Sequence, residues 1–213
     1  MYALFALLSA PAAGFPAAGA SAPSDEAQIQ RLVVAAQQGD AKAQGELYSH
    51  LAPSVFRVLR GLTQSEADAE ELLQDTFVRA FKNLSGYQSR DGARFVSWLM
   101  TIARNAFFNR RRKLGRLTPL EPELLENAAE QWVSGSAGGS TLDLRSALLL
   151  VLAELPERDR WIVTLRYGGE LTADEVAEEC GVTSANIRKV TQRQREYLKS
   201  RLQSLGYSEE DLA

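Results

Sequence analysis

The sequence has very few residues of the kinds that carry enzymatic chemistry. Among its 213 residues there is one cysteine, Cys180, and one histidine, His50. A single cysteine cannot form a disulfide within the chain, and no Cys/His cluster exists from which a zinc site could be built. There is also no glycine-rich loop of the kind that cradles phosphates. These absences argue against an enzyme, so we expect no cofactor and no metal.

Long apolar runs are also scarce. The first residues contain one, but it is too short to span a bilayer, and no membrane insertion is expected. Residues 18–20 (Ala-Gly-Ala) look like a signal cleavage site, yet no Lys or Arg precedes the apolar run, as a secretory signal requires. We therefore predict that residues 1–27 are a disordered leader, or the product of a start codon assigned too early, and that the protein is cytoplasmic.

Charge is distributed unevenly along the chain. The net charge is −3, yet residues 28–116 carry 14 lysines and arginines against 8 acidic residues, a net charge of +6. Residues 117–140 carry four glutamates and no base, and residues 207–213 form an acidic tail. A local basic region can bind nucleic acid even when the whole chain is acidic.

Apolar residues recur at helical spacing along most of the chain, and no stretch alternates convincingly like a strand. The pattern predicts helices over about 53–62, with Pro53 at its start, over about 66–84 and over about 94–113. Proline, glutamate and a Gly/Ser-rich run over 134–140 give residues 117–140 the composition of a linker. We therefore predict an all-α fold of two small helical domains, 28–116 and 141–206, joined by a flexible linker.

Residues 172–193 have the spacing of a helix-turn-helix. Thr172 and Glu175 can form a capping box, Gly181 suits a tight turn, and Thr183 can cap the next helix. This arrangement is typical of units that place their second helix in a DNA major groove. The alternative is an ordinary helical hairpin with a solvated basic face. The side chains expected on the outer face are Thr183, Ser184, Asn186, Arg188, Lys189, Gln192 and Arg193.

The first domain offers a second basic face. The helix over 94–113 ends in four consecutive cations, which is more than the helix dipole needs. Asn105, Asn109 and Arg112 share one face, and such side chains pair with bases. Phe107, Phe108 and Tyr87 can either stack on unpaired bases or fill the core.

The helix over 66–84 carries the opposite charge. Its acidic face would repel DNA and therefore suggests a protein partner with basic residues. The face consists of Asp68, Glu71, Gln74 and Asp75.

Several motifs resemble those of one family. Residues 68–80 closely resemble the second conserved region of sigma-70-type sigma factors, and residues 95–105 look like the helix that follows it. Leu155-Pro156, residues 165–167 and the helix-turn-helix are similar to the fourth conserved region. Two domains with little between them point to the small extracytoplasmic-function (ECF) group.

The resemblance implies that the first domain is sigma region 2 and the second is sigma region 4. The acidic face would dock on the clamp coiled coil of the largest subunit of core RNA polymerase, with the polymerase flap as a second contact. The helix-turn-helix would read the −35 promoter element, and an anti-sigma factor is a further expected partner. The residues implied in recognising and opening the −10 element are Tyr87, Arg90, Arg104, Asn105, Asn109, Arg111 and Arg112. Asn109 stands where many members have Asp, so the preferred −10 bases are expected to differ.

The length of the linker agrees with this interpretation. Twenty-four residues extend to about 80 Å at ~3.3 Å per residue, and two DNA elements two helical turns apart are separated by roughly 70 Å. The rival function is a stand-alone helix-turn-helix regulator. That function explains residues 172–193 but neither the acidic helix nor the second DNA-facing domain.

Overall fold

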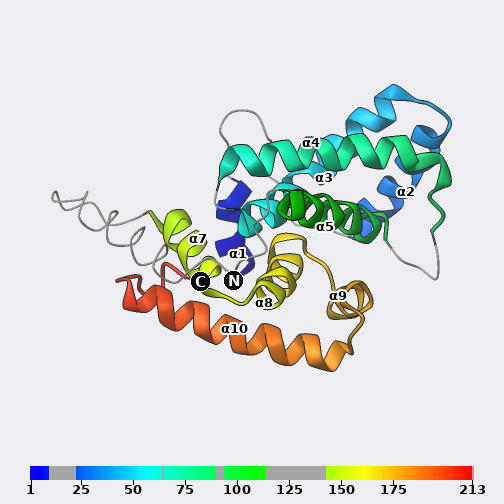
Figure 1. The fold of residues 1–213 in the computed structure, drawn as a ribbon. Coiled ribbons are helices and arrows are strands. Elements are labelled where there is room, and N and C mark those ends of the chain that lie inside the picture. The colour runs from blue at the N-terminus through cyan, green and yellow to red at the C-terminus, as the bar shows by residue number, and fades with distance from the viewer. Residues whose placement is uncertain (10–22, 64, 90–93, 114–142, 213) are drawn as a thin grey trace.

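A computed structural model describes residues 1–9, 23–63, 65–89, 94–113 and 143–212, and these residues contain helices but no strand (Figure 1). The predicted all-α fold is confirmed. The predicted linker and Arg90 lie outside the described residues. The elements are α1 (Tyr2–Ala6), η1 (Leu7–Ser9), α2 (Pro23–Gln37), α3 (Ala41–Leu62), α4 (Glu66–Asn83), η2 (Leu84–Gly86), α5 (Phe95–Lys113), α7 (Leu144–Glu154), α8 (Glu157–Val163), the π-helical turn η3 (Thr164–Gly168), α9 (Ala173–Cys180) and α10 (Ser184–Ser204).

Helix α3 is longer than predicted and does not begin at Pro53. It begins after Asp40, whose carboxylate accepts hydrogen bonds from the amides of Lys42 and Ala43, and Pro53 lies inside it. Proline lacks the amide that would close one helical hydrogen bond. Burial of the apolar face of α3, which includes Leu47, outweighs that loss. From the sequence, Pro53 indicates the start of a helix, because the sequence alone does not show how the preceding residues pack.

Helices α4 and α5 begin where the sequence indicates. Ser65 caps α4 by accepting a hydrogen bond from the amide of Asp68 at 3.3 Å. Leu73 and Phe77 on α4 are buried against Leu99 and Met100 on α5, and α3 packs on both helices. These helices, with α2, form the first half of the molecule, residues 23–113.

The second half, residues 143–212, contains the predicted helix-turn-helix. Both hydrogen bonds of the capping box between Thr172 and Glu175 are present. Gly181 ends α9 with φ +65°, the left-handed conformation that glycine adopts without a steric penalty. Thr183 then caps α10 through the amide of Asn186. Local sequence thus determines this whole unit.

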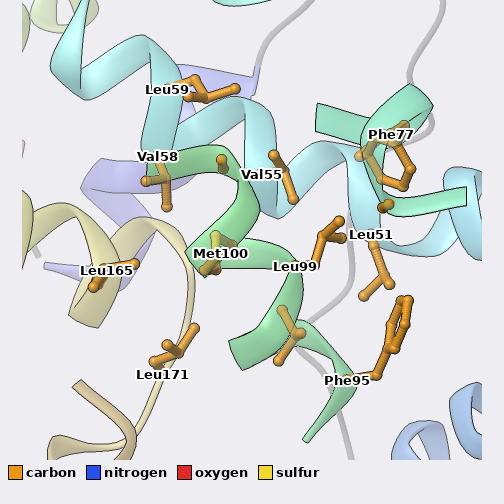
Figure 2. Close-up of a cluster of buried hydrophobic side chains, with 14 of the residues drawn as sticks. Leu51, Val55, Val58, Leu59, Phe77, Phe95, Leu99, Met100, Leu165 and Leu171 are labelled. Atoms are coloured by element: carbon orange, nitrogen blue, oxygen red, sulfur yellow. The ribbon is translucent and has the colours of Figure 1, made fainter. Parts of the chain in front are cut away.

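The two halves, which correspond to the two predicted domains, pack against each other. Leu165 and Leu171 of the second half are fully buried beside Val58 of α3 and Met100 of α5 (Figure 2). Each fully buried leucine side chain contributes roughly 1.5–3 kcal/mol relative to exposure. A continuous apolar core therefore joins the halves, which an analysis of local patterns could not predict.

The first residues also differ from the predicted disordered leader. Tyr2–Ala6 is helical, and Leu4, Phe5 and Leu8 are at most 3% exposed. Helix α2 already begins at Pro23. The leader was predicted to be disordered because its own composition cannot form a core. In the structure, Leu4, Phe5 and Leu8 are buried against apolar surface that other parts of the chain supply.

Candidate nucleic-acid and polymerase interface

The outer face of α10 is open to solvent at its N-terminal end. Ile187 is buried, which turns the polar residues around it outward. Of the seven predicted positions, Ser184 alone is half-buried, and its hydroxyl hydrogen-bonds Asp174. Arg193 is exposed but pairs with Asp159 at 2.7 Å. The exposed predicted residues are Thr183, Asn186, Arg188, Lys189, Gln192 and Arg193.

Helix α5 presents only part of its predicted face. Asn105 and Arg112 are exposed, and the guanidinium of Arg112 donates to the side-chain oxygen of Asn109. Arg104 and Arg111, in contrast, form ion pairs with the second half of the chain. Arg104 lies 3.5 Å from Glu179, and Arg111 lies 2.6 Å from Glu157.

The aromatic side chains fill the core rather than a stacking surface. The ring of Tyr87 is 9% exposed and packs against Phe95 and Trp98, with ring centroids 5.0 and 4.9 Å away. Burial raises the pKa of its hydroxyl. Phe107 is 6% exposed, and Phe108 packs on the same core. Of the two alternatives for Tyr87, Phe107 and Phe108, the structure shows core packing rather than a surface for stacking on bases.

The acidic face of α4 is partly neutralised by the first half itself. Arg110 of α5 lies 2.7 Å from both Asp68 and Glu71, and Asp75 pairs with Arg79 at 2.8 Å. Glu71 and Gln74 are exposed. The face is accessible, but a basic partner would meet carboxylates that already have an arginine beside them.

The strongest polar cluster links α5 to α9. Both carboxylate oxygens of Glu175 accept hydrogen bonds from Arg94, at 2.6 and 2.7 Å, and Ser97 donates a third at 2.9 Å. Burial opposes ionisation of Glu175, but the bonds from Arg94 and Thr172 prevail and lower its pKa to about 2. Thr101 donates to Glu179 at 2.6 Å. The acidic side of the helix-turn-helix thus occupies the cationic side of α5.

A second polar contact lies beside it. Arg57 of α3 is 4% exposed, and it donates to the carbonyl of Gly168 at 2.8 Å and to Glu170 at 2.7 Å. Burial lowers the pKa of Arg57, and the charge of Glu170 opposes that shift. Glu170 has φ +56°, a left-handed conformation that costs a non-glycine residue roughly 1–2 kcal/mol. The contacts of Glu170 hold the connection to α9 in this conformation.

The sequence analysis did not predict any of these contacts between the two halves. Arg94, Arg57 and Glu170 lie outside the motifs, and Glu175 was recognised only as a cap. Their partners are 76 to 113 residues away along the chain, so no local spacing could reveal them. The one available signal was the excess positive charge of residues 28–116.

Nothing in the described part of the chain indicates metal chemistry. No group of three or more His, Cys, Asp or Glu side chains there could hold an ion. Cys180 is half-buried, and burial raises the pKa of its thiol, which makes it less reactive. Among the described residues, no helix is long and apolar enough to cross a bilayer.

Two family models match this chain. The model of sigma-70 region 2 matches residues 47–117, and the model of sigma-70 region 4 matches residues 145–198. The first match spans most of α3, α4 and α5, and the second spans α7 to the greater part of α10.

Relatives and solved structures agree with these matches. The ECF RNA polymerase sigma factor SigM of Bacillus subtilis is 30% identical over 78% of this chain and 98% of its own length. BldN of Streptomyces coelicolor, also an ECF sigma factor, is 34% identical over 81% of this chain, which covers 65% of BldN.

The fold is shared with two solved structures. RpoE of Bartonella quintana, solved with the anti-sigma factor NepR, has a TM-score of 0.56 at 23% identity over 75% of this chain and 96% of its own. CnrH, solved with the cytosolic domain of CnrY, has a TM-score of 0.58 at 22% identity over 83% of this chain and 97% of its own. The chain therefore belongs to the ECF group of sigma-70 family RNA polymerase sigma factors, which direct promoter-specific initiation of transcription.

Proposed function

We propose that three surfaces of this chain divide the work of a sigma factor. The acidic face of α4 binds core polymerase, the exposed side of α5 recognises the −10 element, and the N-terminal end of α10 reads the −35 element. The chain itself supplies no catalytic group, and polymerase performs the chemistry. The chain then acts in the cytoplasm, where bacterial polymerase and promoter DNA meet.

The exposed end of α10 is the observation that carries this proposal. Its first two turns expose an amide and two cations, Asn186, Arg188 and Lys189, which are side chains suited to base edges and phosphates. The turn before it is fixed by a capping box and by Gly181, so the helix is held at a defined angle. A solvated hairpin would not need this combination.

The acidic face of α4 supports the assignment of polymerase binding. Glu71 and Gln74 are exposed on a helix whose other side is buried in the first half. Gln74→Lys places a cation on this face, and Gln38→Lys makes the same change at an exposed position outside it. We expect the first variant to bind core polymerase at least about tenfold more weakly, because like charges oppose each other across the interface. Equal binding by both variants would place the polymerase contact elsewhere.

The direct test is multi-round transcription with purified core polymerase on a library of promoter DNA from the host. Transcripts that depend on this chain and start at defined sites support the proposal, and their upstream sequences give both promoter elements. If no transcripts form, while the protein alone binds specific duplex DNA and does not bind core polymerase, the stand-alone regulator is correct instead.

An anti-sigma factor would meet a particular obstacle in this chain. RpoE of Bartonella quintana was solved with the anti-sigma factor NepR, and we propose that such a protein acts here as well. In this structure the apolar faces of the two halves already cover each other. An inhibitor that binds between the halves must therefore displace these intramolecular contacts. If this protein is purified from unstressed cells of its native host and no such inhibitor purifies with it, the proposal is contradicted.

A further inference from the structure

The first nine residues are ordered only through what they contact. Helix α1 spans Tyr2–Ala6, five residues. An isolated helix this short is not stable in water. Leu4 is 3% exposed, and Phe5 and Leu8 are fully buried. Tertiary contacts therefore hold this segment, which we call the N-terminal segment (residues 2–9).

The N-terminal segment contacts both halves of the molecule. Figure 1 shows it, in dark blue, beside α3 and close to α7 and α8. Phe5 and Tyr2 pack on the ring of Tyr167 in η3, with ring centroids 5.7 and 5.1 Å away. Phe5 and Leu8 also share an apolar cluster with Leu148 and other residues of α7 and α10. The segment thus occupies a groove formed jointly by the first and second halves.

Two glycines, one from each half, border the segment, and one of them lets the halves approach closely. A Cβ atom at Gly61 of α3 would lie 3.7 Å from the Cδ1 of Leu8 and only 2.6 Å from the Cγ2 of Thr164. A Cβ atom at Gly168 of η3 would lie 3.5 Å from the ring of Phe5. Gly61 therefore permits close approach of α3 and η3, and the segment packs in ordinary contact beside this junction.

The same closure covers residues that the proposed function assigns to DNA. Glu179 pairs with Arg104, and Glu157 pairs with Arg111. The carboxylates of the second half thereby take positions that DNA phosphates would otherwise occupy beside α5.

Closure also holds α5 directly against the helix-turn-helix that contains α10. Thr101 of α5 donates to Glu179 of α9 at 2.6 Å, so the halves touch. Two promoter elements two helical turns apart are separated by roughly 70 Å. A closed chain cannot reach both elements at once.

We propose that the N-terminal segment is an intramolecular latch that docks in the groove between α3, α7 and η3 and holds the chain closed, so that the segment must leave before promoter DNA binds. The proposal rests on the proposed function, because it takes α5 and α10 to be the DNA-reading helices. Its occupant is a segment of the same chain, and its affinity comes from Phe5, Leu8 and Leu4.

The latch is tested by measuring the separation of the halves. Helices α4 and α10 lie on opposite sides of the molecule in Figure 1. Each carries an exposed position for labelling, Lys82 on α4 and Ser200 on α10. Lys82→Cys and Ser200→Cys, in a Cys180→Ser background, accept a donor and an acceptor dye for single-molecule energy transfer in the full chain. The latch variant is Phe5→Asp with Leu8→Asp. The control is Ala3→Asp with Ala6→Asp, which adds the same charge on the exposed side of the segment.

We expect the latch variant to raise the open population at least about tenfold, because burial of two large apolar side chains is worth more than that factor. The control should keep the single short separation of the unmodified chain. Phe5→Ala should shift the population less than the double change, and circular dichroism verifies that each variant remains helical. An unchanged separation in the folded latch variant, or equal opening in the control, overturns the proposal.

A second measurement separates this proposal from the proposed function. Binding of the free chain to promoter DNA should be tighter for the latch variant than for the control. If the latch is wrong, the separations stay unchanged while the unmodified chain still supports transcription with core polymerase. If the proposed function is wrong, that transcription is absent while the separations still respond to the latch variant.

Discussion

Single residues decide how firmly the halves are joined, and Glu175 shows this most clearly. The same carboxylate caps α9 and accepts two hydrogen bonds from Arg94, so one side chain orders the helix-turn-helix and fastens it to α5. The side chain of Glu175 is 15% exposed and that of Arg94 is 28% exposed. At this exposure an ion pair is only weakly screened by salt.

We predict that Glu175→Gln lowers the free energy of unfolding by about 1.5–3 kcal/mol, the usual contribution of a hydrogen bond to a charged group. The amide oxygen can still cap α9, so the loss reports mainly on the contact with Arg94. Thermal and denaturant unfolding measure it. Glu178→Gln on the exposed side of the same helix is the matched control, and an equal loss there would show that the contact with Arg94 is unimportant.

The pKa of Glu175 predicts how this contact responds to acid. Its folded pKa of about 2 lies below the ordinary value of 4.5. A carboxylate whose pKa is depressed on folding contributes stability that is complete above the unfolded pKa and is lost as the pH falls through the folded pKa. We expect this contribution to be constant from pH 6 to 8 and to fall between about pH 4.5 and 2. Unfolding of the unmodified chain and of Glu175→Gln should therefore differ at neutral pH and converge toward pH 2.

At the scale of elements, α10 combines two tasks along its length. Its N-terminal turns expose polar side chains around Ile187, while Leu198 and Leu202 further along are fully buried in the cluster that also takes Phe5 and Leu8. The first part is available for DNA, and the second part anchors the helix in the second half.

We predict that Arg188→Ala lowers promoter-dependent transcription about tenfold or more, since a side chain that contacts a base edge is worth roughly 1–3 kcal/mol. Lys189→Ala should weaken DNA binding and also reduce its dependence on salt, as expected for a phosphate contact. Transcription and fluorescence anisotropy at several salt concentrations measure both effects. Lys199→Ala on the same helix is the control, because Lys199 lies beyond the reading turns and pairs with Glu209 at 2.6 Å.

At the scale of the whole molecule, the two halves share one buried core. Leu165 and Leu171 of the second half belong to the same buried cluster as residues of α3, α4 and α5 (Figure 2), and Val176 also belongs to it. Ion pairs between the two halves lie around this core, and one of them joins Arg145 to Glu66 at 3.0 Å.

We therefore predict a single unfolding transition by calorimetry, with equal calorimetric and van't Hoff enthalpies. The latch variant Phe5→Asp with Leu8→Asp should broaden that transition or divide it into two, because the halves lose their shared contacts. Two separate transitions in the unmodified chain would instead mean that the halves unfold independently.

The sequence by itself determined the local units of this protein. Thr172, Glu175, Gly181 and Thr183 specify the helix-turn-helix through hydrogen bonds and backbone preferences that act within a few residues. Ser65 fixes the start of α4 in the same way. The resemblance of residues 68–80 to sigma region 2 then gave the family, which the matches to both sigma regions show.

Only the tertiary structure decided how these units face each other. The partners of Arg57, Arg94 and Arg104 lie 75 or more residues away, and no periodicity links residues so far apart. Tyr87 became a core residue because α5 brings Phe95 and Trp98 against it. The N-terminal segment became ordered because two other parts of the chain form its groove. Burial depends on what the rest of the chain places nearby, and that is a property of the whole fold.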